Sequence, residues 1–189
     1  LGAILLITVN IAGKFGNPFL AFHHAAFQVG SIITTTGYST VDFNTWPTFS
    51  KTVLVLLMFI GASAGSTGGG IKVSRIVILA KSVKKELKQY LHPHSISKIK
   101  MDGKPVEHEV VRSINVFLIA YLLIYAVSIL IVSLDNFDFT TTFTSVAATI
   151  NNIGPGLDLV GPAANFGILS VPSKLVLIFD MLAGRLEIF

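Results

Sequence analysis

Two short polar strips in an apolar chain contain the residue types that can bind a cation. The first strip reads Thr-Thr-Gly-Tyr over residues 35–38, and the second reads Asn-Ile-Gly over residues 152–154. Backbone carbonyls replace the hydration shell of an ion in selectivity filters, and the first strip is close in form to the Thr-Val-Gly-Tyr-Gly filter of potassium channels. Glycine permits the positive φ that aims successive carbonyls to one side. We therefore expect both strips to line a cation pathway.

A glycine-rich stretch, GASAGSTGGG, occupies residues 61–70. Each glycine costs a helix about 1 kcal/mol relative to alanine, so this stretch predicts a break in a helix. Unwound backbone inside a membrane is tolerated only where it lines a cavity or is buried in protein. We expect a movable intramembrane loop. The same letters also fit the G-x-S-x-G pattern of serine hydrolases, which leaves an intramembrane hydrolase with Ser63 as nucleophile as an alternative.

Composition places the chain in a bilayer. Only 13% of its 189 residues are charged, 52% are hydrophobic, and the mean hydropathy is +0.73. A soluble domain carries about 25% charged residues, and a disordered chain has far fewer apolar ones. Because the chain has no cysteine, disulfides and thiolate metal sites are excluded.

The positive charge is concentrated in one segment. Ten of the 14 lysines and arginines lie between Lys72 and Arg112, flanked by apolar sequence. Membrane proteins keep such segments on the cytoplasmic side. We expect a cytoplasmic loop beside lipid headgroups, and we expect no nucleic-acid partner.

The apolar segments predict an all-α polytopic membrane protein. Residues 113–134 carry no charge and would make a helix of about 33 Å, which is a complete span. Residues 19–33 and 138–150 are too short to cross and suit re-entrant helices that lead into the two strips. The chain begins and ends inside apolar runs, so we expect it to be a piece of a longer protein.

The sequence also contains an internal repeat. Residues 50–61 read SKTVLVLLMFIG and residues 173–184 read SKLVLIFDMLAG, with six of the twelve positions identical. Each copy follows a short apolar segment and a polar strip. We therefore expect two span–pore helix–strip–span repeats, at 1–91 with its second span broken at 61–70 and at 113–189, joined by a basic loop at 92–112.

Four stretches together resemble a known family. FQVGSIITTTGYST (27–40), GASAGSTGGGIKVSR (61–75), NNIGPG (151–156) and GRLEIF (184–189) are similar to the Trk/Ktr/HKT superfamily of potassium transporters, most closely its bacterial TrkH/KtrB type. The resemblance implies the last two of four repeats around one pore in the bacterial cytoplasmic membrane. It also implies potassium uptake, homodimeric assembly and a cytosolic nucleotide-binding regulatory ring. It implies a transporter that is not an enzyme and has no cofactor. The transported ion would be K⁺.

The resemblance also assigns residues. It places K⁺-coordinating carbonyls in the first strip at Thr35, Thr36, Gly37 and Tyr38, and in the second at Asn152, Ile153 and Gly154. Thr35, Thr36, Asn152 and Ile153 are the implied K⁺ ligands. It assigns the gate beneath them to Gly61, Gly65, Gly68, Gly69, Gly70 and Arg185. A non-conducting membrane interaction subunit stays open as a further alternative.

Overall fold

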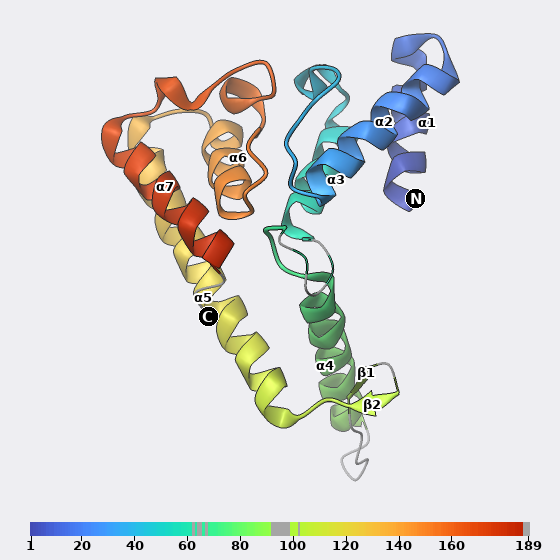
Figure 1. Ribbon diagram of the computed structural model, residues 1–189, viewed down its shortest axis with the longest axis vertical. Coiled ribbons are helices and arrows are strands. Elements are labelled where there is room, and N and C mark those ends of the chain that lie inside the picture. The colour runs from blue at the N-terminus through green and yellow to red at the C-terminus, as the bar shows by residue number, and fades with distance from the viewer. Residues whose placement is uncertain (62, 64–65, 67, 92–98, 102, 187–189) are drawn as a thin grey trace.

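The computed structural model is helical almost throughout (Figure 1). It describes residues 1–61, 63, 66, 68–91, 99–101 and 103–186. Its α-helices are α1 (Gly2–Phe15), α2 (Pro18–Ile33), α3 (Thr48–Phe59), α4 (Val73–Leu91), α5 (His108–Val132), α6 (Phe139–Ile150) and α7 (Val171–Leu186). The strands β1 (Lys100–Met101) and β2 (Lys104–Pro105) pair antiparallel. The predicted all-α class is confirmed.

In the described part of the chain, one helical stretch is long and apolar enough to cross a bilayer by itself, His108–Asp135. It consists of α5 and the 3-10 turn η2 (Ser133–Asp135), and 28 helical residues span about 42 Å. This helix begins at His108, inside the 92–112 segment that we expected to be a loop. The described remainder of that segment contributes the β1–β2 hairpin.

The predicted break in the helix around residues 61–70 is present. Helix α3 ends at Phe59 and α4 begins at Val73. The chain between them closes at its base, because Gly61 donates its amide to the Ile71 carbonyl at 2.9 Å and Ile71 donates to the Phe59 carbonyl at 3.2 Å. The two ends of the glycine-rich stretch are therefore held together by backbone hydrogen bonds.

The two short helices that precede the strips begin in the same way. Asn17 caps α2 by accepting the Phe19 amide at 2.9 Å, and Asp138 caps α6 by accepting the Thr140 amide at 2.9 Å. Such side chains satisfy amides that have no partner within a helix. The Thr140 amide also holds the pKa of Asp138 below its usual range, so this cap stays ionised at neutral pH.

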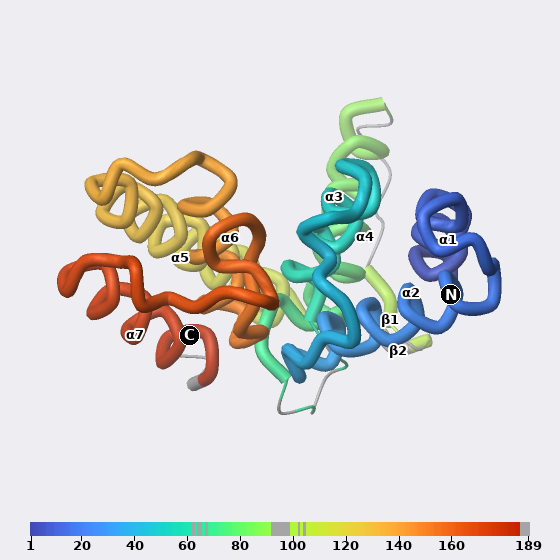
Figure 2. Tube along the Cα trace, turned by 90° about the horizontal axis from the view of Figure 1, so that it is seen from above, coloured from blue at the N-terminus to red at the C-terminus, as the bar shows by residue number. Residues whose placement is uncertain are grey.

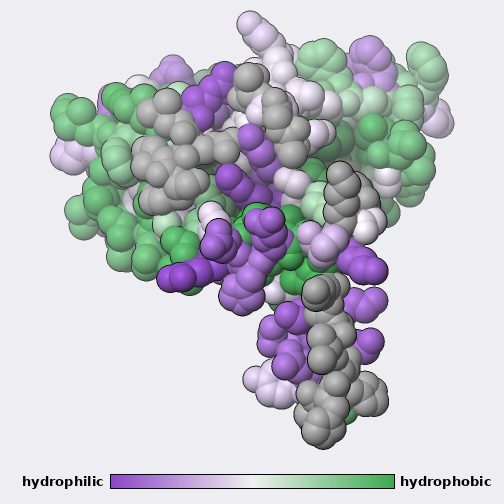
Figure 3. Space-filling model, turned by 60° about the horizontal axis from the view of Figure 1, so that its bottom comes forward, coloured by the Kyte–Doolittle hydropathy of each residue, from purple (hydrophilic) through white to green (hydrophobic). Residues whose placement is uncertain are grey.

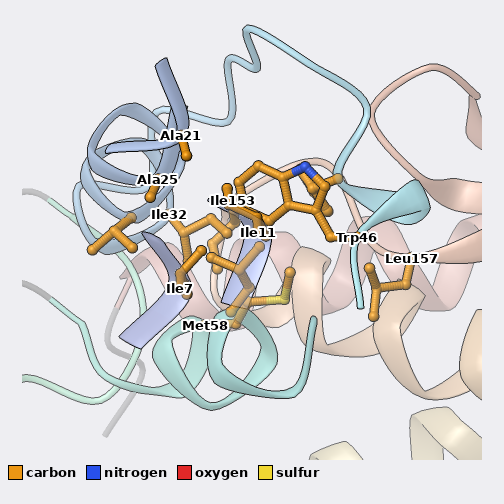
Figure 4. Close-up of a cluster of buried hydrophobic side chains, with 12 residues drawn as sticks. Ile7, Ile11, Ala21, Ala25, Ile32, Trp46, Met58, Ile153 and Leu157 are labelled. Carbon is orange, nitrogen blue, oxygen red and sulfur yellow. The ribbon is translucent and has the colours of Figure 1, made fainter. Parts of the chain in front are cut away.

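Two apolar cores hold the helices together. The first joins α1, α2 and α3 (Figure 4). Two side chains from beyond α6, Ile153 and Leu157, pack into this core with Met58 and Trp46. The second core joins α5, α6 and α7. Because the second strip inserts into the first core, the two halves of the chain are interlocked, with α6 between α7 and α3 (Figure 2).

Polar surface gathers at one end of the molecule. The lysine-bearing end of α4 and the β1–β2 hairpin lie at the opposite end from the loops that follow the two strips (Figure 1). Hydrophilic side chains concentrate around this projection and hydrophobic ones flank it (Figure 3). A separation of basic, hydrophilic surface from hydrophobic surface is typical of a membrane protein at the edge of the bilayer.

We predict that Gly184→Ala destabilises the protein by about 1–3 kcal/mol, because a Cβ there overlaps the carbonyl oxygen of Ile150 and forces α7 away from α6. Gly13→Ala is the matched control, since a Cβ on that helical glycine meets nothing within 4 Å and alanine favours a helix. Thermal unfolding in detergent measures both. Equal midpoints for the two variants would contradict the packing described here.

Candidate functional site: two backbone strips above a glycine loop

The first strip leaves α2 through a tight backbone turn. Thr35 has φ 54° and Gly37 has φ 78°, both in the left-handed region. The amides of Thr36 and Gly37 donate to the Ser31 carbonyl, at 2.9 and 3.4 Å. A left-handed threonine is uncommon, because its side chain is branched. The surrounding structure therefore fixes this turn strongly.

The second strip repeats this backbone at the end of α6. Asn152 has φ 55° and Gly154 has φ 107°. The amides of Ile153 and Gly154 donate to the Ala148 carbonyl, again at 2.9 and 3.4 Å. Residue by residue, the second strip matches the first with an offset of 117 positions. Both helices thus end in one backbone motif that turns the chain out of the helix.

The two strips touch each other. A Cβ on Gly37 would overlap the Ile153 carbonyl oxygen and lie 3.2 Å from Cδ of Pro155. Glycine at position 37 is required both by its positive φ and by this close approach. A cavity of about 720 Å³ lies beside the strips and is lined by both of them and by α7.

The glycine-rich loop reaches the strips. Gly69 is buried, and a Cβ on it would overlap the Asn151 carbonyl oxygen. Its amide donates to Oγ1 of Thr35 at 3.4 Å. A Cβ on Gly61 would in turn overlap the carbonyl oxygen of Gly69. The structure thus brings the loop against the first residues of both strips, with Gly68 and Gly70 beside Gly69 in the chain; Gly65 lies outside the described residues.

The end of α7 meets the second strip from another side. Nδ2 of Asn152 donates to the Met181 carbonyl at 3.0 Å. Gly184 packs against the Ile150 carbonyl oxygen. Arg185 follows in the last turn of α7 with an exposed side chain. The second strip is therefore fastened to the helix that carries the arginine.

Sequence reasoning missed two polar side chains that orient the strips. Oγ of Ser31 donates to the Tyr38 carbonyl at 2.6 Å, which turns that carbonyl toward α2. Asn151 is fully buried, and its Oδ1 accepts from the Tyr121 hydroxyl at 3.0 Å. The sequence does contain a signal for both residues: each is a polar residue next to a strip, at the end of an otherwise apolar segment.

A further missed contact joins the loops beyond the strips. Nδ2 of Asn44 donates to the Asp158 carbonyl at 2.9 Å, and Oδ1 of Asn44 accepts the Asp158 amide at 2.8 Å. These residues are 114 positions apart in the chain. This reciprocal pair holds the exits of the two strips at a fixed separation.

The hydrolase alternative lacks the structural context it requires. A nucleophile elbow places its serine between a strand and a helix. Ser63 instead follows helix α3, and among the described residues the strands are β1 and β2, far along the chain. The geometry gives this alternative no support.

Comparison with known proteins decides the family. The family model described as TrkH, cation transport protein, matches residues 18–189. The chain belongs to the TrkH family. It is similar to the Trk system potassium uptake protein TrkH of Vibrio parahaemolyticus, with 43% identity over 93% of this chain and 36% of that protein. The protein of the same name from Escherichia coli is 39% identical over 93% and 36%.

A solved structure agrees with the fold. The crystal structure of the potassium transporter TrkH from Vibrio parahaemolyticus matches with a TM-score of 0.87 at 40% identity, covering 99% of this chain and 40% of that one. The chain thus spans between a third and two fifths of the length of these relatives. TrkH family membership makes the chain a multi-pass protein of the bacterial cytoplasmic membrane.

We predict that Gly37→Ala displaces the second strip, whereas Gly103→Ala does not. Both glycines have nearly the same positive φ, 78° and 79°, so the backbone strain of an alanine is matched. A Cβ on Gly103 meets nothing within 4 Å. Hydrogen exchange of the Ile153 and Gly154 amides is the measurement. Faster exchange is expected for Gly37→Ala alone, and unchanged exchange would contradict contact between the strips.

Proposed function

We propose that this chain forms two walls of a potassium-conducting pore, with the two strips as its filter. The observation that carries the proposal is the shared backbone motif of the strips, which touch at Gly37 and Ile153. Two segments 117 residues apart adopt one uncommon conformation and face one another. A pore built from repeats around an axis requires this arrangement.

The electrostatics of the strips suit a cation of low charge. Helices α2 and α6 both end at a strip, and the C-terminal end of a helix carries about half a negative charge. Neither strip contains an acidic residue. Neutral carbonyls backed by two helix ends replace the water of a monovalent ion without holding it too tightly to leave.

The proposed ligands are backbone carbonyls of three residues in each strip. They are Thr35, Thr36 and Gly37 in the first strip and Asn152, Ile153 and Gly154 in the second. The Tyr38 carbonyl already accepts a hydrogen bond from Ser31, so we assign it the weakest role of the residues expected to coordinate K⁺. The carbonyls do the binding, so the side chains of these residues have other tasks: position 37 requires glycine, and the side chains of Thr35 and Asn152 hold the strips to their neighbours.

The proposed gate is the glycine-rich loop together with Arg185. The loop is fixed at its base by the Gly61–Ile71 hydrogen bond, while Gly69 lies directly against the strips. Short side chains leave its backbone free to move between blocking and open positions. A cation in the last turn of α7 adds an electrostatic barrier to ions below the filter.

The relatives support the ion and suggest the partners. Both proteins named above are described as potassium uptake proteins. Because the chain spans 36% of their length, the activity of the complete pore is part of the proposal, as are its remaining walls. We further propose a second copy of the protein, membrane lipid around α5 and α7, and a cytosolic nucleotide-binding ring at the basic end near residues 72–112.

Uptake of ⁸⁶Rb⁺ into liposomes that contain the protein carrying this chain tests the proposal. We expect uptake that excess K⁺ blocks and excess Na⁺ does not. Equal block by both ions would contradict potassium selection. No uptake by folded protein, with the regulatory ring present, would overturn conduction and favour the interaction-subunit alternative.

We predict that Arg185→Ala raises ⁸⁶Rb⁺ uptake, because it removes a positive charge from the ion path. Lys174→Ala is the matched control: Lys174 is on the same helix but near its outer end, where it donates to the Gly167 carbonyl at 2.9 Å. We expect the control to leave uptake unchanged. Unchanged or lost uptake in the arginine variant would contradict the barrier.

A further inference from the structure

A carboxyl group is buried inside the α5–α6–α7 core. Asp180 has no exposed surface and lies on the face of α7 that also carries Leu177 and Ala183, which are 4% and 7% exposed. These positions are three residues apart, so they form one stripe along the helix. That stripe packs on α5 and α6, and an aspartate interrupts its apolar side chains.

Among the described residues, the carboxyl of Asp180 has one hydrogen-bond partner. Its Oδ1 lies 2.7 Å from Oγ of Ser128 on α5, and Ser128 is itself only 2% exposed. Oδ2 is buried and has no hydrogen-bond partner among the described residues. An ionised carboxylate buried with a single neutral donor is strongly disfavoured, and such a group takes up a proton instead.

The described titratable groups on α5, α6 and α7 make no hydrogen bond to Oδ2 of Asp180. On α5, the Tyr121 hydroxyl donates to Asn151 and the Tyr125 hydroxyl donates to the Phe143 carbonyl. Helix α6 contains no titratable residue. On α7 itself, Lys174 is committed to Gly167, and Arg185 lies five residues further on with an exposed side chain.

The internal repeat shows that the helix does not need an acid at this position. Asp180 corresponds to Leu57 in the matching segment of α3. Leu57 packs against the first apolar core. A leucine satisfies the packing of the repeated span, so the aspartate has a role other than filling space.

We propose that Asp180 is a proton-binding site that stays neutral at physiological pH and joins α7 to α5 through a carboxyl–hydroxyl hydrogen bond with Ser128. In the neutral form Oδ1–H donates to Ser128, and Oδ2 is an uncharged oxygen that tolerates burial. The proton comes from bulk water and returns there, so no co-reactant is needed. Loss of this proton at alkaline pH places a charge in the core and loosens the α5–α7 contact.

The site lies next to the functional strips. Met181, whose carbonyl accepts from Asn152, is the residue after Asp180. Gly184, against Ile150, is one turn further along the same helix. A displaced α7 would therefore pull on the second strip, so the proton state of Asp180 sets how firmly the strip is held.

Infrared spectroscopy of the protein in lipid tests the proton directly and does not depend on transport. We expect a protonated-carboxyl C=O band at neutral pH that Asp180→Asn removes. Glu109→Gln is the control, because Glu109 is an exposed acid at the start of α5. A band that survives in Asp180→Asn, or no band in the native protein, would overturn the proposal.

A second measurement separates a neutral acid from a charged one. Asparagine mimics the neutral carboxyl, so Asp180→Asn should fold and keep ⁸⁶Rb⁺ uptake at neutral pH, and its unfolding midpoint should fall less than that of the native protein as pH rises. Ser128→Ala should lower the midpoint at neutral pH. Loss of folding in Asp180→Asn, or identical pH dependence in both proteins, would show that the group is a carboxylate or that its proton is irrelevant.

Discussion

The constraint behind this structure is that backbone without helical hydrogen bonds cannot face lipid. The chain leaves helical geometry at the two strips and at the glycine-rich stretch, and the structure puts described residues of all three against one another. Gly37 meets Ile153, and Gly69 meets Asn151. In the proposed pore, the carbonyls left without a protein donor are the ones that receive the ion.

Close backbone contact requires residues without side chains, and this explains where the glycines lie. A Cβ at position 37, 61, 69 or 184 would overlap a backbone carbonyl oxygen. At the first position of each strip, by contrast, the side chain makes a hydrogen bond. The Thr35 hydroxyl accepts from the Gly69 amide, and the Asn152 side-chain amide donates to the Met181 carbonyl. These two hydrogen bonds join the proposed filter to the glycine-rich stretch at Gly69 and to α7 at Met181.

The sequence predicted the features that depend on local patterns. Apolar runs located the helices, the glycines located the break after α3, and the paired strips identified two segments that the structure brings into contact. It did not predict the side-chain hydrogen bonds of Asn44 with Asp158 or of Ser31 with the Tyr38 carbonyl. The position of a polar residue in the sequence does not indicate which group it will bond in the folded chain. The start of α5 at His108 was also missed, since polar residues continue a helix beyond the apolar core that periodicity detects. For the same reason the burial of Asp180 became visible only once three helices were packed together.

In the proposed pore, carbonyls of both strips hold one ion. Anomalous diffraction from crystals of the protein grown with Tl⁺, a heavy substitute for K⁺, tests it without reliance on flux or regulation. We expect anomalous density between residues 35–37 and residues 152–154, reduced by added K⁺ and unaffected by Na⁺. Tl⁺ bound only elsewhere, or density that K⁺ does not displace, would contradict it.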